Sequence, residues 1–251
     1  MRIAYENNID DIATTSFTAL TAAVGFPIEN VKEQRLSVEY RSTSVTAQTI
    51  VINLGAAHSI TTAAILGHNL TSSASIIVAF NSVDSWASPP VTETLTYNAD
   101  VILKFFTSHN YQYVRFYIND TTNTDGYISI GRLWLGDYIT ITPSSLLDFS
   151  VTKMRSDNVI HGRGRQKYAS IGIGWRLFSF TFPPTKNAVL ILLQSMIDYV
   201  GRHSSFIFCN FDTDRTYTLV EPCYCSLTED IVFSHDTGMK FTYEMIFEEE
   251  K

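Results

Sequence analysis

The segment that most constrains the fold is 48–70, which reads QTIVINLGAAHSITTAAILGHNL. It opens with a β-branched run at 49–52, and these residue types suit a half-buried pleated surface. The turn-forming residues 53–55 interrupt the run, and a second apolar run follows at 60–66 before Gly67. Two short apolar strands joined by a turn of small residues predict an all-β unit.

Composition sets the broad class of the chain. Its 251 residues suffice for one large β domain or two ordinary ones. Charged residues make up 17% and apolar residues 45%, which predicts a folded globular protein, and 13 Tyr and 16 Phe favour strands over helices. The net charge of −7 argues against a general nucleic-acid binder. No apolar run approaches the length of a membrane span, and no signal peptide is expected, so we expect synthesis in a cytosol.

The order of motifs in the first half resembles the galactose-binding-like (discoidin-type) β-sandwich. Four segments carry the resemblance: Asn53-Leu54-Gly55, the turn Asn81–Trp86, the strand Tyr113-Val114-Arg115-Phe116, and the closing strand Tyr127–Gly136. It implies a jelly-roll sandwich over residues 1–138. The family's Asp-Gly-Asn calcium pattern is absent at 39–42, so no calcium site is carried over. Loops at one end of the sandwich would form a sugar platform from Tyr40, Arg41, Asn81 and Trp86. The alternative for Trp86 is an ordinary core or edge aromatic.

The second half, residues 139–251, mixes strands with one helix. A long strand is predicted over 168–182, and its apolar residues change phase after Trp175, which predicts a β-bulge or a strong bend. The strand ends at Pro183-Pro184. A helix then runs from an N-cap at Thr185 to Val200, with an apolar stripe and a capping Gly201. Further strands are expected at 205–209, 216–220, 223–227 and 239–248.

This order resembles the tail-tube-like domains of long-tailed bacteriophages, which include distal tail and minor tail proteins. The matching words are Trp175-Arg176-Leu177-Phe178-Ser179-Phe180 before the helix and Phe241-Thr242-Tyr243-Glu244 near the chain end. The resemblance implies a homo-oligomeric, hexameric ring around the tail axis, with a long hairpin reaching the neighbouring subunit. The fold class is therefore mainly β: a galactose-binding-like sandwich followed by a tail-tube-like sandwich with one packed α-helix.

A basic loop is the main candidate for subunit contact. It contains Arg155, Arg163, Arg165 and Lys167 against Asp157 alone. Its guanidinium groups suit phosphate, but the loop lacks the order of a nucleotide site. The other interpretations are a solvated hairpin tip and a basic arm that docks on an acidic patch of a neighbouring copy. The docking arm is the preferred interpretation, closely followed by the hairpin tip.

The three cysteines are a candidate metal site. Cys209, Cys223 and Cys225 would need His203 or His235 as a fourth ligand. Because the Cys-x-Cys spacing differs from that of a zinc knuckle, we expect buried free thiols and no metal or other cofactor. No Ser, His and acid grouping stands in a catalytic context, so an enzyme is not expected.

These observations predict a structural component of a phage tail tip or baseplate. It would form a ring that joins the tail tube to the distal adsorption apparatus, and it would be located in the virion. Its partners would be copies of itself and the tube, hub and tape-measure proteins, with a host-surface glycan as a further partner and no sequence-specific nucleic acid. The alternative is a lectin-like carbohydrate-binding module without a ring role.

Overall fold

The structure is a computed structural model that describes residues 1–141, 148–161, 166–185, 187–209, 222–236 and 240–251. It is mainly β, and the fold class expected from the sequence is confirmed. The N-terminal part contains β1 (Arg2–Ala4), α1 (Asn8–Asp11), β2 (Ser16–Ala19), the 3-10 helix η1 (Ile28–Lys32), β3 (Tyr40–Arg41), β4 (Gln48–His68), β5 (Ser75–Asn81), β6 (Val91–Leu95), β7 (Val101–Asn119) and β8 (Ser129–Gly136).

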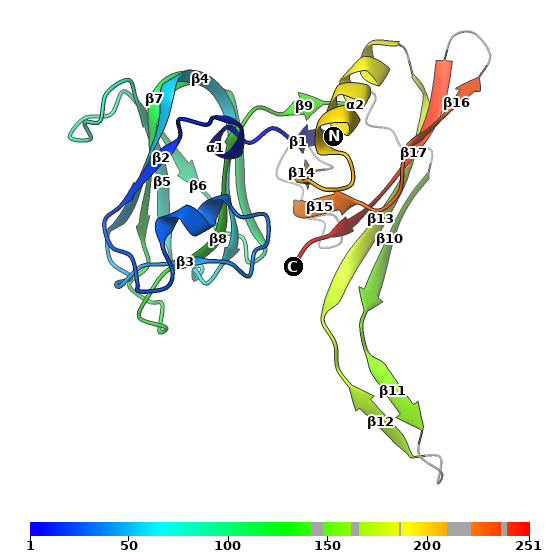
Figure 1. The fold of residues 1–251 in the computed structure, drawn as a ribbon, viewed down its shortest axis with the longest axis horizontal. Coiled ribbons are helices and arrows are strands. Elements are labelled where there is room, and N and C mark those ends of the chain that lie inside the picture. The colour runs from blue at the N-terminus through cyan, green and yellow to red at the C-terminus, as the bar shows by residue number, and fades with distance from the viewer. Residues whose placement is uncertain (142–147, 162–165, 186, 210–221, 237–239) are drawn as a thin grey trace.

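The C-terminal part contains one long helix and the remaining strands (Figure 1). Its elements are β9 (Ile139–Thr140), β10 (Asp148–Arg155), β11 (Asn158–His161), β12 (Lys167–Ser170), β13 (Gly174–Thr185), α2 (Asn187–Val200), β14 (Ser205–Cys209), β15 (Cys223–Leu227), β16 (Val232–Asp236) and β17 (Lys240–Glu249). The strand expected at 216–220 lies outside the described residues.

Strand β4 is a single bent strand of 21 residues, whereas the sequence predicted two strands joined by a turn. Strand β7 pairs with it on both sides of the expected turn, with a register shift between Asn53 and His58. Gly55 takes a φ of +80° inside this irregular segment, a conformation that favours glycine. The turn chemistry therefore makes a bulge that bends one long strand pair. Before the bend β4 also pairs with β2, and after it with β8.

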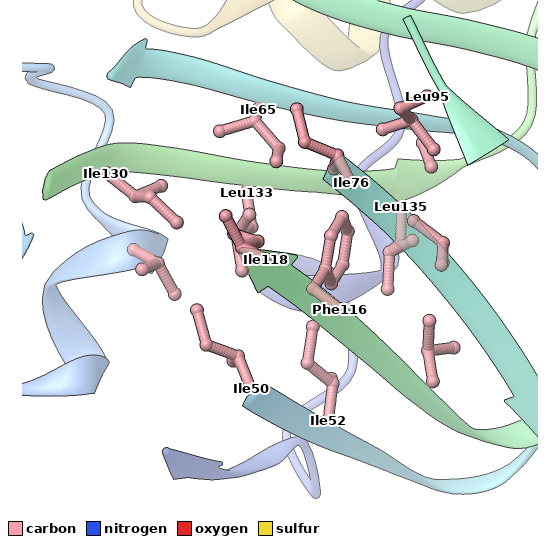
Figure 2. Packing of buried hydrophobic residues seen from close by; sticks show 14 of the residues in the cluster. Ile50, Ile52, Ile65, Ile76, Leu95, Phe116, Ile118, Ile130, Leu133 and Leu135 are labelled. Carbon is pink, nitrogen blue, oxygen red and sulfur yellow. The ribbon is translucent and has the colours of Figure 1, made fainter. Parts of the chain in front are cut away.

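The bend folds the N-terminal sheet into a sandwich around one apolar core (Figure 2). The alternating residues Ile50 and Ile52 of β4 enter this core, together with Phe116 and Ile118 of β7. The segment after the bend also contributes, through Ile60, Ala63 and Ile65. The family-like strand 113–118 is thus a core strand, as its period-two pattern predicted.

The C-terminal sheet has the order β10-β13-β17-β15-β14-β1-β9, with β16 beside β17. Helix α2 packs on one face of it, burying Leu190, Leu193, Met196 and Val200 against aromatic residues of the strands. Gly201 has a φ of +52° and its amide donates to Ile197, as expected of a helix C-cap. Leu192 also falls at the helical spacing of the predicted apolar stripe, but it is 39% exposed, so the prediction was wrong for this residue.

Strands β10 to β13 form a hairpin arm that extends away from the rest of the C-terminal part (Figure 1). Its base pairs continuously from Asp148↔Thr181 to Arg155↔Gly174, so the bulge predicted near Trp175 is absent. The two apolar phases belong to the two faces of the strand: Phe178 and Phe180 are buried in the core, and Trp175 lies on the opposite face. A register shift occurs later, between Phe182 and Thr185.

The chain crosses between its two parts at both ends of the N-terminal region. Strand β1 lies between β14 and β9 in the C-terminal sheet, so the first residues belong to the second part; the boundary at 138 stays a prediction. A third apolar cluster joins the two parts, formed by Ala4, Ala64, Leu66, Val101, Trp134, Ile207 and Tyr224. All eight residues of β8 are buried, because one face meets the sandwich core and the other meets this cluster. None of the described helices has the length and apolarity that a membrane crossing requires.

Candidate functional site

Two of the four proposed glycan-facing residues are engaged inside the protein. Tyr40 is fully buried, and its hydroxyl donates to the Thr21 carbonyl oxygen at 2.6 Å. Burial raises the pKa of Tyr40 to about 12. The Arg41 guanidinium lies 4.0 Å from the Phe26 ring and 4.8 Å from the Tyr127 ring, and its Nε donates to Glu39. Both side chains serve the local fold.

The other two residues lie in the loop that follows β5. Asn81 is buried and donates to the Ser85 carbonyl oxygen at 2.5 Å, which closes the loop. Trp86 is half-buried; its indole nitrogen donates to Asp84 at 2.6 Å, and the Arg115 guanidinium lies 4.8 Å from its ring centre. Of the four, Trp86 is the side chain best placed to meet a ligand.

The strand register separates these two pairs. Asn81 pairs with Tyr113, whereas Arg41 contacts Tyr127 in the loop after Asn119. Tyr113 and Asn119 are six residues apart on β7, which is about 20 Å along a strand. The single platform expected from the sequence is therefore not assembled, and glycan contact by any of these residues stays a prediction.

The basic loop falls largely outside the described residues. Arg155 is exposed and its Nε pairs with Asp157 at 3.0 Å. Arg163 and Arg165 lie outside the described residues, as does the side chain of Lys167, whose backbone belongs to β12. Their role in subunit contact stays a prediction.

Sequence reasoning missed an apolar surface at the base of the hairpin arm. On β13, Trp175 and Leu177 lie on the face opposite Phe178, and Ile171 and Ile173 lie just before this strand, in residues 171–173 that belong to no strand. Met154 pairs with Trp175 across the ladder. Ile171 is 79% exposed and Ile173 is 68% exposed. We call these five residues the outer stripe. The sequence signal for this surface is the run of apolar residues at the odd positions from 171 to 177, from which the sequence alone predicts a bulge instead.

The three cysteines are buried in adjacent strands, as expected. Cys209 lies on β14 and the other two on β15, where the Cys223 and Cys225 sulfur atoms are 2.9 Å apart. Burial and the neighbouring thiol raise the pKa of Cys225, which favours the protonated, unreactive form. Among the described residues, no group of three or more His, Cys, Asp or Glu side chains could hold a metal ion.

Comparison with known proteins gives structural neighbours only. No family model and no curated protein matches the chain. A family 32 carbohydrate-binding module of Clostridium perfringens NanJ, solved with galactose, is 16% identical with a TM-score of 0.41, covering 55% of this chain and 100% of its own. The lectin domain of lectinolysin, solved with Lewis B antigen, is 11% identical with a TM-score of 0.43, covering 53% and 97%. A Ruminococcus gnavus fucosidase solved with fucose is 11% identical with a TM-score of 0.45, covering 54% and 28%.

Proposed function

We propose that this protein is a structural subunit that assembles with copies of itself through the hairpin arm. The observation that carries the proposal is the outer stripe, a group of partly to largely exposed apolar side chains on and just before β13, a strand whose other face is already packed. Full burial of a large aliphatic side chain contributes roughly 1.5–3 kcal/mol. Ile171 and Ile173 together therefore hold several kcal/mol of association free energy that the single chain leaves unused.

The far end of the arm also favours a partner. Strands β11 and β12 pair with each other alone among the described strands. An isolated two-stranded ribbon is marginally stable in water. Val159 and Ile160 are adjacent in β11, so they point to opposite faces, and they are 41% and 60% exposed. A neighbouring surface that covers this ribbon would stabilise it.

Charge favours a second copy as that neighbour. Residues 148–185 contain six Lys and Arg against two Asp, in a chain of net charge −7, so the remainder of the chain carries −11. A basic arm and an acidic body are complementary across copies. Because the arm docks on a different surface of the next copy, the contact is heterologous, and such contacts close into rings or continue as filaments.

The biological setting that we propose is a bacteriophage tail tip. The support is the order of elements around Trp175–Phe180 and α2, which resembles tail-tube-like domains. The ring would join the tail tube to the distal adsorption apparatus in the virion, with tube, hub and tape-measure proteins as partners. The N-terminal sandwich would sit on the ring as an appended module. A non-enzymatic role is part of the same proposal.

Self-association tests the proposal directly. The full chain should form discrete oligomers in native mass spectrometry and rings in negative-stain micrographs. The double variant Ile171→Asn/Ile173→Asn should shift the population to monomer, because it removes the most exposed part of the outer stripe. Its thermal stability should stay within about 0.5 kcal/mol of wild type, since both side chains are already largely in water.

The matched control is Leu20→Asn/Val24→Asn. These residues are 61% and 100% exposed on the N-terminal part, so the control makes the same chemical change away from the arm. It should leave the oligomers intact. A wild-type chain that stays monomeric at high concentration would overturn the proposal, and so would oligomers that both double variants weaken equally.

Glycan binding by the N-terminal sandwich is a second candidate function. The observation that favours it is Trp86, a half-buried indole held by Asp84 and flanked by Arg115 in a surface loop. Aromatic faces pack on sugar rings, and neighbouring polar groups can hold hydroxyls.

A glycan array followed by calorimetry tests this second function. Trp86→Ala should weaken any sugar that binds by tenfold or more, whereas Val83→Ala in the same loop, at an exposed position, should not. An array without hits, or an equal loss in both variants, counts against it. Because neither variant lies on the arm, assembly should be unchanged in both.

A further inference from the structure

Two clefts lie side by side at the contact between the N-terminal and C-terminal parts. Both are lined by residues 36–37 and by the chain's last two residues, Glu250 and Lys251. The larger, about 340 Å³, has Asp100 and Glu249 among its lining residues. The smaller, about 280 Å³, has the basic residues Arg35, Arg202 and His203 among its lining residues. The two clefts therefore differ in charge although they share one wall.

The smaller cleft, which we call the basic cleft, collects positive charge from three separate segments. Arg35 follows η1, Arg202 and His203 follow α2, and Lys251 comes from beyond β17. Its one side-chain carboxylate, Glu250, accepts a hydrogen bond from the Ser226 hydroxyl at 2.5 Å. Three permanent cations stand against the Glu250 side chain and the main-chain carboxylate of Lys251, so the cleft keeps a net positive charge when His203 is neutral.

The two guanidinium groups are not used within the described part of the chain. Neither Arg35 nor Arg202 forms an ion pair or side-chain hydrogen bond there. The Lys251 ammonium is 3.8 Å from the Glu249 carboxylate, at the long limit of an ion pair. Gathering like charges without a counter-charge is unfavourable, and this protein has acidic residues in excess.

The end of α2 explains only part of this arrangement. Carbonyl groups at a helix C-terminus attract cations, which suits Arg202 and His203 just beyond Gly201 at the end of α2. Arg35 and Lys251 belong to other segments, so attraction to the C-terminus of α2 does not explain why they line the same cleft. Four basic residues from three segments therefore line one cleft, which makes an anion the ligand that suits it.

We propose that the basic cleft binds a compact dianionic oxyanion of the phosphate type. The net positive charge of the cleft attracts an anion, and guanidinium groups bind phosphate oxygens bidentately. The ligand is either free phosphate or a phosphoryl group on a larger molecule. The site is separate from the outer stripe, so it stands independently of self-assembly.

Calorimetric titration of the full chain tests the site. The probes are inorganic phosphate and glycerol 3-phosphate, at constant ionic strength, with acetate as a monoanionic comparison. We expect saturable binding of both phosphates at one site per chain and no saturable binding of acetate. Equal binding of the two assigns the site to a phosphoryl group in general, whereas binding of inorganic phosphate alone assigns it to the free ion.

The variant Arg35→Gln/Arg202→Gln should weaken phosphate binding tenfold or more. Both side chains are exposed and unpaired, so circular dichroism and thermal stability should not change. The control Lys153→Gln/Arg155→Gln makes the same change in net charge at exposed positions on the hairpin arm, and should bind as wild type. No saturable binding, or an equal loss in both variants, would overturn the proposal.

Discussion

At the scale of single residues, Glu93 links two strands of the sandwich through charge. Its carboxylate oxygens lie 2.8 Å from the Lys104 ammonium and 2.9 Å from His109 Nε2, and its side chain is 18% exposed. Burial alone would raise the pKa of Glu93, but the hydrogen bonds and charges of Lys104 and His109 outweigh it, so the pKa lies below its ordinary value. A depressed carboxyl pKa adds stability above the unfolded-state pKa of about 4.3, and this stability is lost as the pH falls through the folded-state pKa.

Glu93→Gln should therefore destabilise the protein by about 1 kcal/mol at pH 7, and the difference should be smaller at pH 3, below the ordinary pKa of the carboxyl. Urea unfolding of both proteins at the two pH values measures it. Glu33→Gln is the control, because that carboxylate is exposed and has no ion pair within the described residues, and it should show no pH-dependent difference. A Glu93 effect of equal size at pH 7 and pH 3 would contradict the electrostatic explanation.

At the scale of elements, the end of β8 fits only because Gly136 has no side chain. A Cβ there would lie 2.1 Å from the Glu6 carbonyl oxygen, in the link between β1 and α1. Asn7 in that link holds the same strand, accepting from the Leu135 amide at 3.0 Å. Gly136→Ala should force the link away and destabilise the protein by roughly 1–3 kcal/mol in thermal or urea unfolding. Gly174→Ala is the matched control: its nearest contact would be 3.5 Å, so its stability should stay within about 0.5 kcal/mol of wild type.

The same elements show how far the sequence could lead. Period-two alternation located the second half of β7, and the helical stripe with Gly201 located α2, because both patterns arise within one element. The sequence does not distinguish a bend in β4 from a turn between two strands, because Gly55 is compatible with both. Only the pairing of β7 with β4 on both sides of Gly55 shows that the strand is continuous. The outer stripe was predicted to be a bulge because β13 has apolar residues on both faces, and the sequence alone does not show which face is covered. The distance between Arg41 and Trp86 depends on the register in which the strands pair, and the sequences of the two loops do not determine that register.

At the scale of the whole molecule, the N-terminus ties the two parts together. Ile3 is fully buried in the core of the C-terminal part, whereas Ile9, six residues later, is fully buried in the sandwich core. The short polar segment between them crosses from one core to the other. The sequence of residues 1–30 has no periodicity that predicts this crossing, because β1 has only three residues and pairs with a strand about 200 residues away.

The position of Ile3 predicts which strands lose stability when its side chain is replaced. Ile3→Asp buries a carboxylate without a partner and should destabilise the C-terminal sheet by about 3 kcal/mol or more. Hydrogen exchange should accelerate in β14 and β15 while β4 and β7 stay protected. Ile9→Asp is the reciprocal variant and should accelerate exchange in β4 and β7 first. If both variants loosen the same strands, the two cores are one cooperative unit, and the contact through Trp134 and Tyr224 is strong enough to join their unfolding.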